Sequence, residues 1–292
     1  SPDKNNFSLT SPISESYCLP NGALRIASFL RLIQEVSIGG SAFLGKGVET
    51  LKAKNLYWVV MSYHFQISRW PSANEKITIE TFPGVTKAFI YPRHYIVYDE
   101  KGAIIVRGIS LWAVLDHANH QPTIPPANGV DIAAIHEEGE LSWPPRQVLE
   151  GLSVKENRLV RNSDLDFNGH MNNIRYVDFA LDSDDFAFYS SHTPSEFQMT
   201  FSSETTLGKS MEILSKLSDE RRDYQGKVEG KPVFALSVLF KNSQIAPVFK
   251  KKDGGFLFPR NRMRLHQGQE SAILIIVLKR TFYEFQQRTA HA

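Results

Sequence analysis

The 292-residue sequence contains a single cysteine, Cys18. One thiol excludes a disulfide within the chain and any metal site built from several cysteines. Long apolar runs are also missing, because the longest, residues 272–278, ends at Lys279-Arg280. A helix that spans a bilayer needs roughly 20 apolar residues. The sequence therefore predicts a protein without an internal disulfide and without a membrane-spanning helix.

The chain has almost no excess charge: 33 basic residues oppose 31 acidic ones, which leaves a net charge of +2. No overall field therefore recruits nucleic acid or a membrane surface, although a local basic patch for an acidic partner stays open. The first residues, Ser-Pro-Asp-Lys-Asn-Asn, lack the apolar stretch of a secretory signal. We expect the cytoplasm as the compartment.

Apolar residues repeat at helical spacing and then at strand spacing. Residues 22–44 predict one long helix, whose far end is perturbed by Gly39-Gly40. Period-two alternation predicts strands at residues 57–67, 76–82, 93–98 and 103–115, with a hairpin turn at 99–102. One helix followed by an antiparallel sheet is an α+β unit.

The same pattern then repeats after a proline-rich stretch. We predict a first half at residues 1–120, a linker at 121–150 and a second half at 151–242, whose helix opens at Asn168-Gly169. Asn21-Gly22-Ala23 corresponds to Asn168-Gly169-His170, and His64-Phe65-Gln66-Ile67 corresponds to Glu196-Phe197-Gln198-Met199. These matches occur in the same order beside the same elements, which favours an internal duplication. Residues 243–292 form an extension to which we assign no role.

Chemistry-bearing side chains are concentrated in the second half only. Asp166, Asn168 and His170 alternate, so an extended segment projects all three to one side. The helix that follows would offer the backbone N–H groups of Gly169 and His170 to an oxyanion. Because Leu19 and Ala23 stand at the positions of Asp166 and His170 in the first half, we expect one active site per chain.

This segment resembles the Asp-x-Asn-x-His-x-Asn-Asn signature of acyl-ACP thioesterases. The likeness covers residues 5–240, including 22–45 and 112–116 in the first half. It implies an α+β double hot-dog fold, two tandem halves each with a long helix wrapped by an antiparallel sheet. It also implies hydrolysis of fatty-acyl-ACP to free fatty acid and holo-ACP, which ends fatty acid synthesis, with acyl carrier protein as partner and no metal or organic cofactor.

The resemblance assigns catalytic positions to Asp166, Asn168 and His170, and a further acid to Glu204. Plant members carry a cysteine just after this glutamate, where this chain has Thr205. A cysteine–histidine mechanism is therefore not expected. Water activated by Glu204 or Asp166 with help from His170 is one route, and direct attack by Asp166 is another.

Each of these residues also has a purely structural interpretation. An aspartate before a helix caps it, a histidine can be structural, and Glu204 can be a solvated acid at a strand end. Asp164 is expected to be a cap, and Asn172 and Asn173 are expected to satisfy backbone groups in the first helical turn.

An acyl chain needs an apolar tunnel, which we expect between helix and sheet in the first half. Residues on the helix and the first strand are predicted to line it: Leu24, Ile26, Phe29, Leu30, Ile33, Met61, Tyr63 and Phe65. Residues at this spacing are also the usual core of such a unit.

Two alternative functions stay open. An acyl-CoA thioesterase would use the same chemistry, because both substrates share the phosphopantetheine arm. A non-catalytic acyl-binding hot-dog protein would need no polar set such as Asp166, Asn168 and His170. The sequence leaves chain-length preference and a homodimer undecided.

Overall fold

The computed structural model describes residues 6–135, 141–218 and 220–242. The proposed extension at 243–292 lies outside the described residues. In the first half the strands are β1 (Phe7–Pro12), β2 (Leu56–Ile67), β3 (Lys76–Pro83), β4 (Tyr91–Tyr98) and β5 (Ile104–Asp116), and the helices are α1 (Ile26–Phe43) and α2 (Val48–Lys52). Helix α3 (Pro125–Asn128) lies in the segment predicted as the linker. The second half contains β6 (Ser153–Leu159), α4 (Asn173–Asp182), α5 (Phe186–Ser191), β7 (His192–Phe201), β8 (Ser210–Leu217), β9 (Arg221–Val228) and β10 (Lys231–Asn242).

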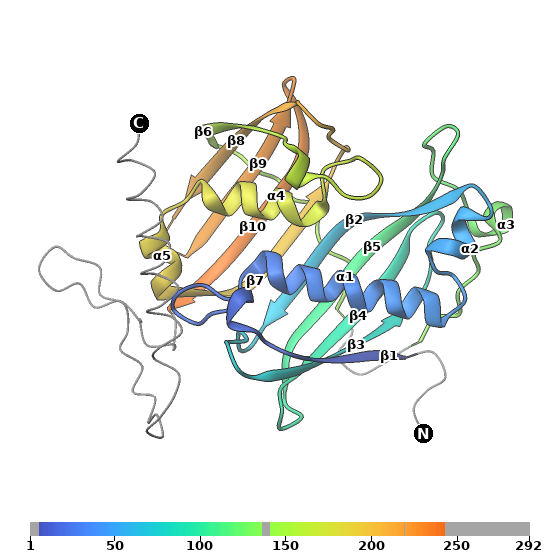
Figure 1. Ribbon diagram of the computed structural model, residues 1–292, viewed down its shortest axis with the longest axis horizontal. Helices are drawn as coiled ribbons and strands as arrows, with labels where there is room; N and C mark the ends of the chain where they lie inside the picture. Colours follow the sequence, from blue (N-terminus) through green and yellow to red (C-terminus); the bar gives the residue numbers. More distant parts are fainter. Residues whose placement is uncertain (1–5, 136–140, 219, 243–292) are drawn as a thin grey trace, which may run out of the picture. The chain divides into compact units, whose positions relative to one another are not determined.

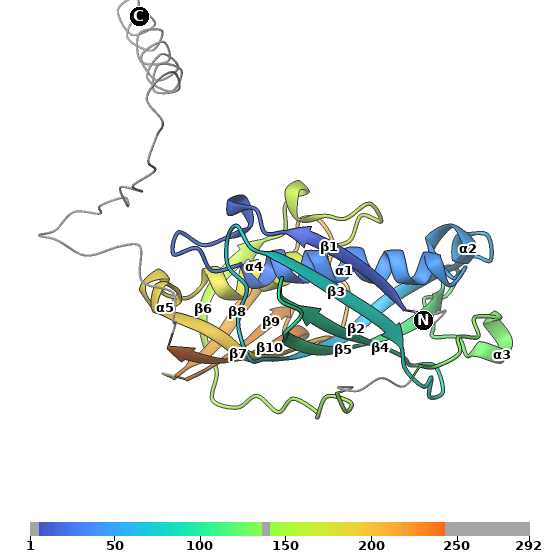
Figure 2. The ribbon, with the colours of Figure 1, turned by 90° about the horizontal axis from the view of Figure 1, so that it is seen from below.

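The ten strands form one antiparallel sheet in the order β1-β3-β4-β5-β2-β7-β10-β9-β8-β6. The two halves meet where β2 pairs with β7 (Figure 1). Helices α1 and α4 lie on the same face of this sheet, and the segment before β6 crosses the opposite face (Figure 2). The architecture is the α+β double hot-dog that the sequence predicts.

Helix α1 begins at Ile26 rather than at Gly22, and it continues through Gly39-Gly40 to Phe43. Gly22 has a φ of +84°, so it belongs to a turn before the helix. The two later glycines make room for side chains from the sheet. A Cβ on Gly40 would lie 2.6 Å from Arg93 Nη1, and one on Gly39 would lie 2.5 Å from the Phe7 ring. Gly39-Gly40 is therefore a packing feature of the helix and does not end it.

The turn before each long helix is built twice in the same way. An isolated bridge joins Cys18 to Leu24 in the first half and Leu165 to Met171 in the second. Each turn also contains a left-handed glycine, Gly22 at +84° and Gly169 at +82°. A shared backbone conformation at matching positions is strong support for an internal duplication.

The centre of the sheet lies between two equivalent phenylalanines. Phe65 of β2 is paired in register with Phe197 of β7, and their ring centroids are 5.0 Å apart. Both rings are fully buried in a core that continues from one half into the other. The halves therefore share one hydrophobic core as well as one sheet.

Short and edge elements are what the sequence pattern misses. In the second half the sequence also predicts strands at residues 196–201, 210–216 and 233–240, which correspond to β7, β8 and β10. Strands β1, β6 and β9 and helices α2, α3 and α5 have no counterpart among the predicted elements. Strand β6 is largely exposed, and its sequence, Ser-Val-Lys-Glu-Asn-Arg-Leu, shows little apolar alternation. Such a strand is held by pairing with its neighbour rather than by a buried face. Among the described residues, no helix is long and apolar enough to cross a membrane.

Candidate active site

The predicted polar set lies on a loop and not on the first turn of a helix. Helix α4 begins at Asn173, and Asn172 caps it by accepting a hydrogen bond from Ile174 N at 3.0 Å. The prediction that Asn168-Gly169 opens the helix is therefore wrong by one tight turn, because Gly169 adopts a left-handed conformation. The role expected of Asn172 as a local backbone acceptor is confirmed.

Asp166 holds the conformation of this loop. Its Oδ1 accepts hydrogen bonds from Asn168 N at 2.8 Å and from His170 N at 3.2 Å. Gly169 N donates to the Asp166 carbonyl at 3.1 Å. The two N–H groups predicted to hold an oxyanion, those of Gly169 and His170, already have acceptors inside the turn. Neither N–H group is an unpaired donor at the N-terminus of a helix, which contradicts that prediction.

His170 and Glu204 face each other across two adjacent loops. Main-chain contacts bring the loops together: His170 forms a bridge with Thr206, and Met171 N donates to Thr205 O at 2.8 Å. His170 Nε2 lies 3.4 Å from Glu204 Oε2, and both side chains are partly exposed. The structure thus places Glu204 beside the histidine, as its assigned position requires.

Asn168 differs from its counterpart in the first half. The Asn21 amide is fully used, since Nδ2 donates to the carbonyls of Tyr189 and Ser190 and Oδ1 accepts from Ala23 N. Asn168 is exposed, and its side chain makes no hydrogen bond within the described part of the chain. The duplicated asparagine is structural in one half and available to a ligand in the other.

The first half contributes to the same site through Tyr57. Burial raises the pKa of the Tyr57 hydroxyl, and the negative charge of Glu204 raises it further. The Tyr57 ring packs on His117 with centroids 4.4 Å apart. Burial also raises the pKa of Tyr176 in the second half, and the charges of Glu204 and Asp166 add to this effect. The carboxylates therefore lie at the junction of the two halves.

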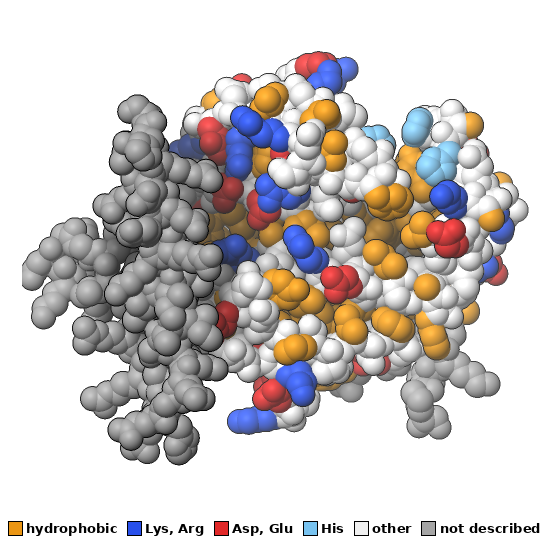
Figure 3. All heavy atoms as spheres, in the orientation of Figure 1, with side chains coloured by type: hydrophobic (Ala, Val, Ile, Leu, Met, Phe, Trp, Pro, Cys, Tyr) orange, Lys and Arg blue, Asp and Glu red, His pale blue; other side chains and the backbone are white. Residues whose placement is uncertain are grey.

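A cavity of about 670 Å³ opens beside the loop. It lies in the first half, between the C-terminal part of α1, helix α2 and the sheet, and Asp166, Phe167, Asn168, Asn172 and Asn173 form its edge. In Figure 3 apolar side chains gather on the helix-covered face between this loop and α2. The remaining walls come from several elements, among them Gln34, Ser37, Ile38, Ser41, Val48, Leu51, Leu56, Tyr57, Trp58, Val60, Tyr91, Arg93, Trp112 and His117.

None of the residues predicted to line an acyl tunnel lines this cavity. Seven of the eight are buried in the shared core, namely Leu24, Ile26, Phe29, Leu30, Ile33, Tyr63 and Phe65, and Met61 is partly exposed. They lie in the turn before α1, on the N-terminal part of α1 and in the middle of β2, where the second half packs on them. Phe29, for example, contacts Phe197. The cavity does lie in the first half, but its lining residues on α1 lie one to three helical turns closer to the C-terminal end of the helix than the predicted ones.

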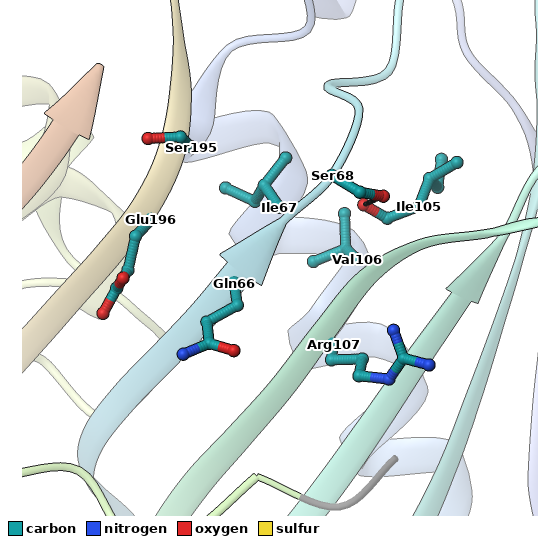
Figure 4. Close-up of a pocket in the computed structure, with 8 residues that line it drawn as sticks. All are labelled: Gln66, Ile67, Ser68, Ile105, Val106, Arg107, Ser195 and Glu196. Atoms are coloured by element: carbon teal, nitrogen blue, oxygen red, sulfur yellow. Dashed lines mark hydrogen bonds between the residues drawn. The ribbon is translucent and has the colours of Figure 1, made fainter. Parts of the chain in front are cut away.

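A second hollow of about 430 Å³ lies at the ends of β2, β5 and β7 (Figure 4). Gln66, Arg107 and Glu196 line it. It contains no member of the predicted catalytic set, and nothing in its lining provides a nucleophile beside a base.

Asp164 has the structural role expected of it. Its carboxylate is 4% exposed, accepts from Arg161 N at 2.9 Å and pairs with Arg175 Nε at 2.9 Å. Within the described ranges, no group of three or more His, Cys, Asp or Glu side chains is arranged to hold a metal ion.

Comparison with known families gives two adjoining matches. Residues 13–126 match the acyl-ACP thioesterase N-terminal domain, and residues 151–235 match the acyl-ACP thioesterase C-terminal domain. The chain belongs to the acyl-ACP thioesterase family. It is therefore a member of a family of thioester hydrolases, consistent with the motif around His170.

Curated relatives of this family member are distant. It is 26% identical over 216 residues to a dodecanoyl-[acyl-carrier-protein] hydrolase of Cinnamomum camphora, a match that covers 68% of this chain and 56% of that protein. A palmitoyl-acyl carrier protein thioesterase of Gossypium hirsutum is 22% identical, with 68% and 52% covered. The chain thus spans about half the length of these relatives.

Solved structures of the family confirm the fold. An acyl-ACP thioesterase from Bacteroides thetaiotaomicron aligns with a TM-score of 0.76 at 21% identity, covering 82% of this chain and 100% of that one. A 12:0-ACP thioesterase from Umbellularia californica gives 0.67 at 19% identity, with 82% and 98% covered.

Sequence reasoning missed the first-half residues of this site, above all Tyr57, His117 and Arg93. Tyr57 and Arg93 lie in predicted strands, where a tyrosine or an arginine carries no functional signal. His117 falls at the end of a strand without a partner pattern. Only the pairing of β2 with β7 brings Tyr57 near Glu204.

Proposed function

We propose that this thioesterase-family protein hydrolyses fatty-acyl thioesters of acyl carrier protein, releasing the free fatty acid and holo-ACP and so ending chain synthesis. One observation carries the proposal: the largely apolar cavity of about 670 Å³ opens onto Asp166 and Asn168 beside the His170–Glu204 pair. An apolar cavity with a few convergent polar groups at its edge is the usual form of a site for such a substrate.

In this mechanism Glu204 and His170 activate water. The water attacks the thioester carbonyl carbon, its proton passes to the pair, and the C–S bond breaks to release the phosphopantetheine thiolate, which takes up a proton. The separation of 3.4 Å between His170 Nε2 and Glu204 Oε2 is long for a hydrogen bond, but such contacts tighten when substrate binds.

Asp166 supports the loop and does not act as the nucleophile in this scheme. Its Oδ1 already accepts two backbone N–H groups, so this oxygen is engaged in holding the turn. This favours attack by water over a mixed anhydride. Asn168, whose amide is unused within the described residues, donates to the carbonyl oxygen in place of the two backbone groups once expected there.

The test is a thiol-release assay with acyl-ACP and acyl-CoA of matched chain length. His170→Ala should lower kcat by roughly 10²–10⁴ if the histidine moves a proton, and Glu204→Gln should cause a similar loss. A matched control is Glu196→Gln, which alters an acid on the neighbouring strand β7 outside the site.

The outcomes separate the alternatives. Faster cleavage of acyl-ACP supports the carrier protein as partner, whereas equal or faster cleavage of acyl-CoA supports the acyl-CoA alternative. A folded protein that cleaves neither thioester contradicts hydrolysis and leaves acyl binding. The cytoplasm and a homodimer stay predictions; the plant relatives compared above are named as chloroplastic proteins, and that location is theirs.

A further inference from the structure

The proposed site has one assigned donor for the oxygen of the thioester carbonyl, the amide of Asn168. The backbone N–H groups of Gly169 and His170 are already bonded to Asp166 within the turn. Sites that stabilise an oxyanion are built from preorganised donors that converge on one point. A second donor is therefore expected on the wall of the cavity that faces the loop.

Tyr57 lies on that wall. It stands near the start of β2, is half-buried and lines the cavity together with Asn168. The negative charge of Glu204 acts on its hydroxyl. A carbonyl that receives water from the His170–Glu204 pair at the edge of this cavity therefore lies between Tyr57 and the loop.

A histidine contacts the hydroxyl of Tyr57. Tyr57 Oη lies 2.9 Å from His120 Nδ1, and the Tyr57 ring packs on the His117 ring with centroids 4.4 Å apart. A tyrosine hydroxyl has one proton to donate, and its oxygen can accept at the same time. With the imidazole proton on Nδ1, His120 donates to Tyr57 and leaves the tyrosine proton free to point into the cavity.

The loop after β5 holds His120 in an unusual conformation. His120 N donates to the Asp116 carbonyl at 2.9 Å, and Asp116 Oδ1 accepts from Ala118 N at 2.7 Å. His120 has a φ of +56°, which residues other than glycine seldom adopt. Strained residues of this kind cluster at functional sites. The loop thus maintains a costly backbone conformation in which the His120 ring reaches Tyr57.

Tyr57 is suited to donate rather than to act as a base. Burial raises the pKa of its hydroxyl, and the charge of Glu204 adds to the rise. The hydroxyl therefore keeps its proton at neutral pH. A neutral donor can bond to a negatively charged oxygen without giving up that proton, which is what an oxyanion site requires.

We propose that Tyr57 is a catalytic residue that donates a hydrogen bond to the thioester carbonyl oxygen opposite Asn168, and that His120 is the positioning residue that orients its hydroxyl. This rests on the proposed thioester hydrolysis and adds first-half residues to its machinery. As water adds to the carbonyl carbon, the π electrons of the carbonyl move onto its oxygen, and Tyr57 bonds to that oxygen while keeping its proton. The electrons return when the C–S bond breaks and the thiolate leaves.

The first experiment measures kcat and KM for acyl-ACP hydrolysis by Tyr57→Phe, which removes the hydroxyl and keeps the ring on His117. Its kcat should fall roughly 10²–10³-fold, the effect of losing one oxyanion donor, while KM stays within about twofold of the wild type because the contact forms in the transition state. Tyr98→Phe, which removes a hydroxyl that donates to Glu80 on β3 outside the cavity, should leave both unchanged. Wild-type kcat in Tyr57→Phe overturns the proposal, and so does a raised KM at unchanged kcat.

Two variants of His120 test its positioning role. His120→Gly adopts the same backbone without strain but lacks the ring, so kcat should fall roughly tenfold, the rate equivalent of one hydrogen bond. His120→Asn tolerates the left-handed backbone and places an amide where Nδ1 stands, so it should recover most of that loss at unchanged KM. Wild-type activity in His120→Gly, or no recovery in His120→Asn, overturns the positioning role.

Calorimetric binding separates this inference from the proposed function. The probes are an alkyl trifluoromethyl ketone, whose hydrate imitates the tetrahedral intermediate, and the carbonyl-free trifluoroalkane of equal length. Tyr57→Phe should bind the ketone about tenfold more weakly than the wild type does and bind the trifluoroalkane alike. This result holds even if no thioester is cleaved, in which case hydrolysis fails and the assignment of Tyr57 as the carbonyl donor stands. Equal binding of the ketone by both proteins overturns the assignment.

Discussion

Cys18 illustrates how burial decides the reactivity of a single residue. It is 6% exposed, and burial raises the pKa of its thiol to about 11, with Glu15 and Glu75 adding to the rise and Arg25 opposing it. The thiolate is the nucleophilic form of cysteine. Cys18 is therefore inert at neutral pH, which agrees with the expectation that no cysteine takes part in catalysis.

We predict that iodoacetamide alkylates native Cys18 at least about 100-fold more slowly than the unfolded chain at pH 8, because a pKa about two units higher lowers the thiolate fraction by that factor. Mass spectrometry with and without denaturant checks this. The folded state favours the neutral thiol, so its stabilising effect is complete below the unfolded pKa of about 9 and is lost as the pH rises through about 11. Equal alkylation rates would contradict the prediction.

At the residue scale, the proposed catalytic residues could be grouped from the sequence because they lie close together in it. Asp166, Asn168 and His170 share one loop, so their proximity follows from their spacing in the sequence. Arg93 could not be predicted as a cavity residue, since an arginine in a strand does not show from its spacing what it faces. The prediction that the N–H groups of Gly169 and His170 hold an oxyanion was wrong for a local reason. The left-handed Gly169 bends the chain into a turn, and the turn itself uses both donors.

At the scale of elements, long periodic segments were predicted and capped or edge segments were not. The predicted helix at 22–44 and strand at 57–67 correspond to α1 and β2. The start of α1 was placed too early because apolar spacing already begins at Leu24, which lies in the preceding turn. The cavity was placed in the correct half but on the wrong part of α1, because spacing shows which face is buried and not what covers it.

The linker before β6 is an element held by side chains rather than by backbone pairing. Gln147 Nε2 donates to Gln198 O at 3.1 Å and to Ser237 Oγ at 3.3 Å. Thr200 Oγ1 donates to Gln147 Oε1 at 2.7 Å. One glutamine therefore attaches the linker to β7 and β10 on the face opposite the helices (Figure 2).

Replacing Gln147 by Ala should release this segment. We expect trypsin to cut after the exposed Arg146 several-fold faster, because local opening exposes backbone to the protease, while thioester hydrolysis stays near the wild-type rate. Timed proteolysis followed by mass spectrometry measures the site and the rate. Gln66→Ala, on an exposed position of β2, is the matched control. Unchanged cleavage after Arg146 in Gln147→Ala would show that other contacts hold the linker.

At the scale of the whole molecule, the two halves are one cooperative unit because they share a sheet and a core. The pairing of β2 with β7 places Phe65 against Phe197 where the duplicated halves meet. Helices α1 and α4 lie side by side over this line (Figure 1). The first half supplies most of the cavity wall and the second half supplies the loop with the proposed catalytic residues, so the proposed site needs both halves.

A double-mutant cycle on Phe65 and Phe197 tests whether the two halves unfold as one cooperative unit. Phe65→Leu and Phe197→Leu should each lower the free energy of unfolding by roughly 1–3 kcal/mol. The double variant should lose about 0.5–1.5 kcal/mol less than the sum, because the aromatic contact is removed only once. Denaturant unfolding followed by fluorescence and circular dichroism should show one coincident transition. Phe82→Leu, whose ring stacks on His94, should combine additively with Phe197→Leu. Two separate transitions in the wild type would mean that each half folds on its own, and the site would then form by docking of two independent units.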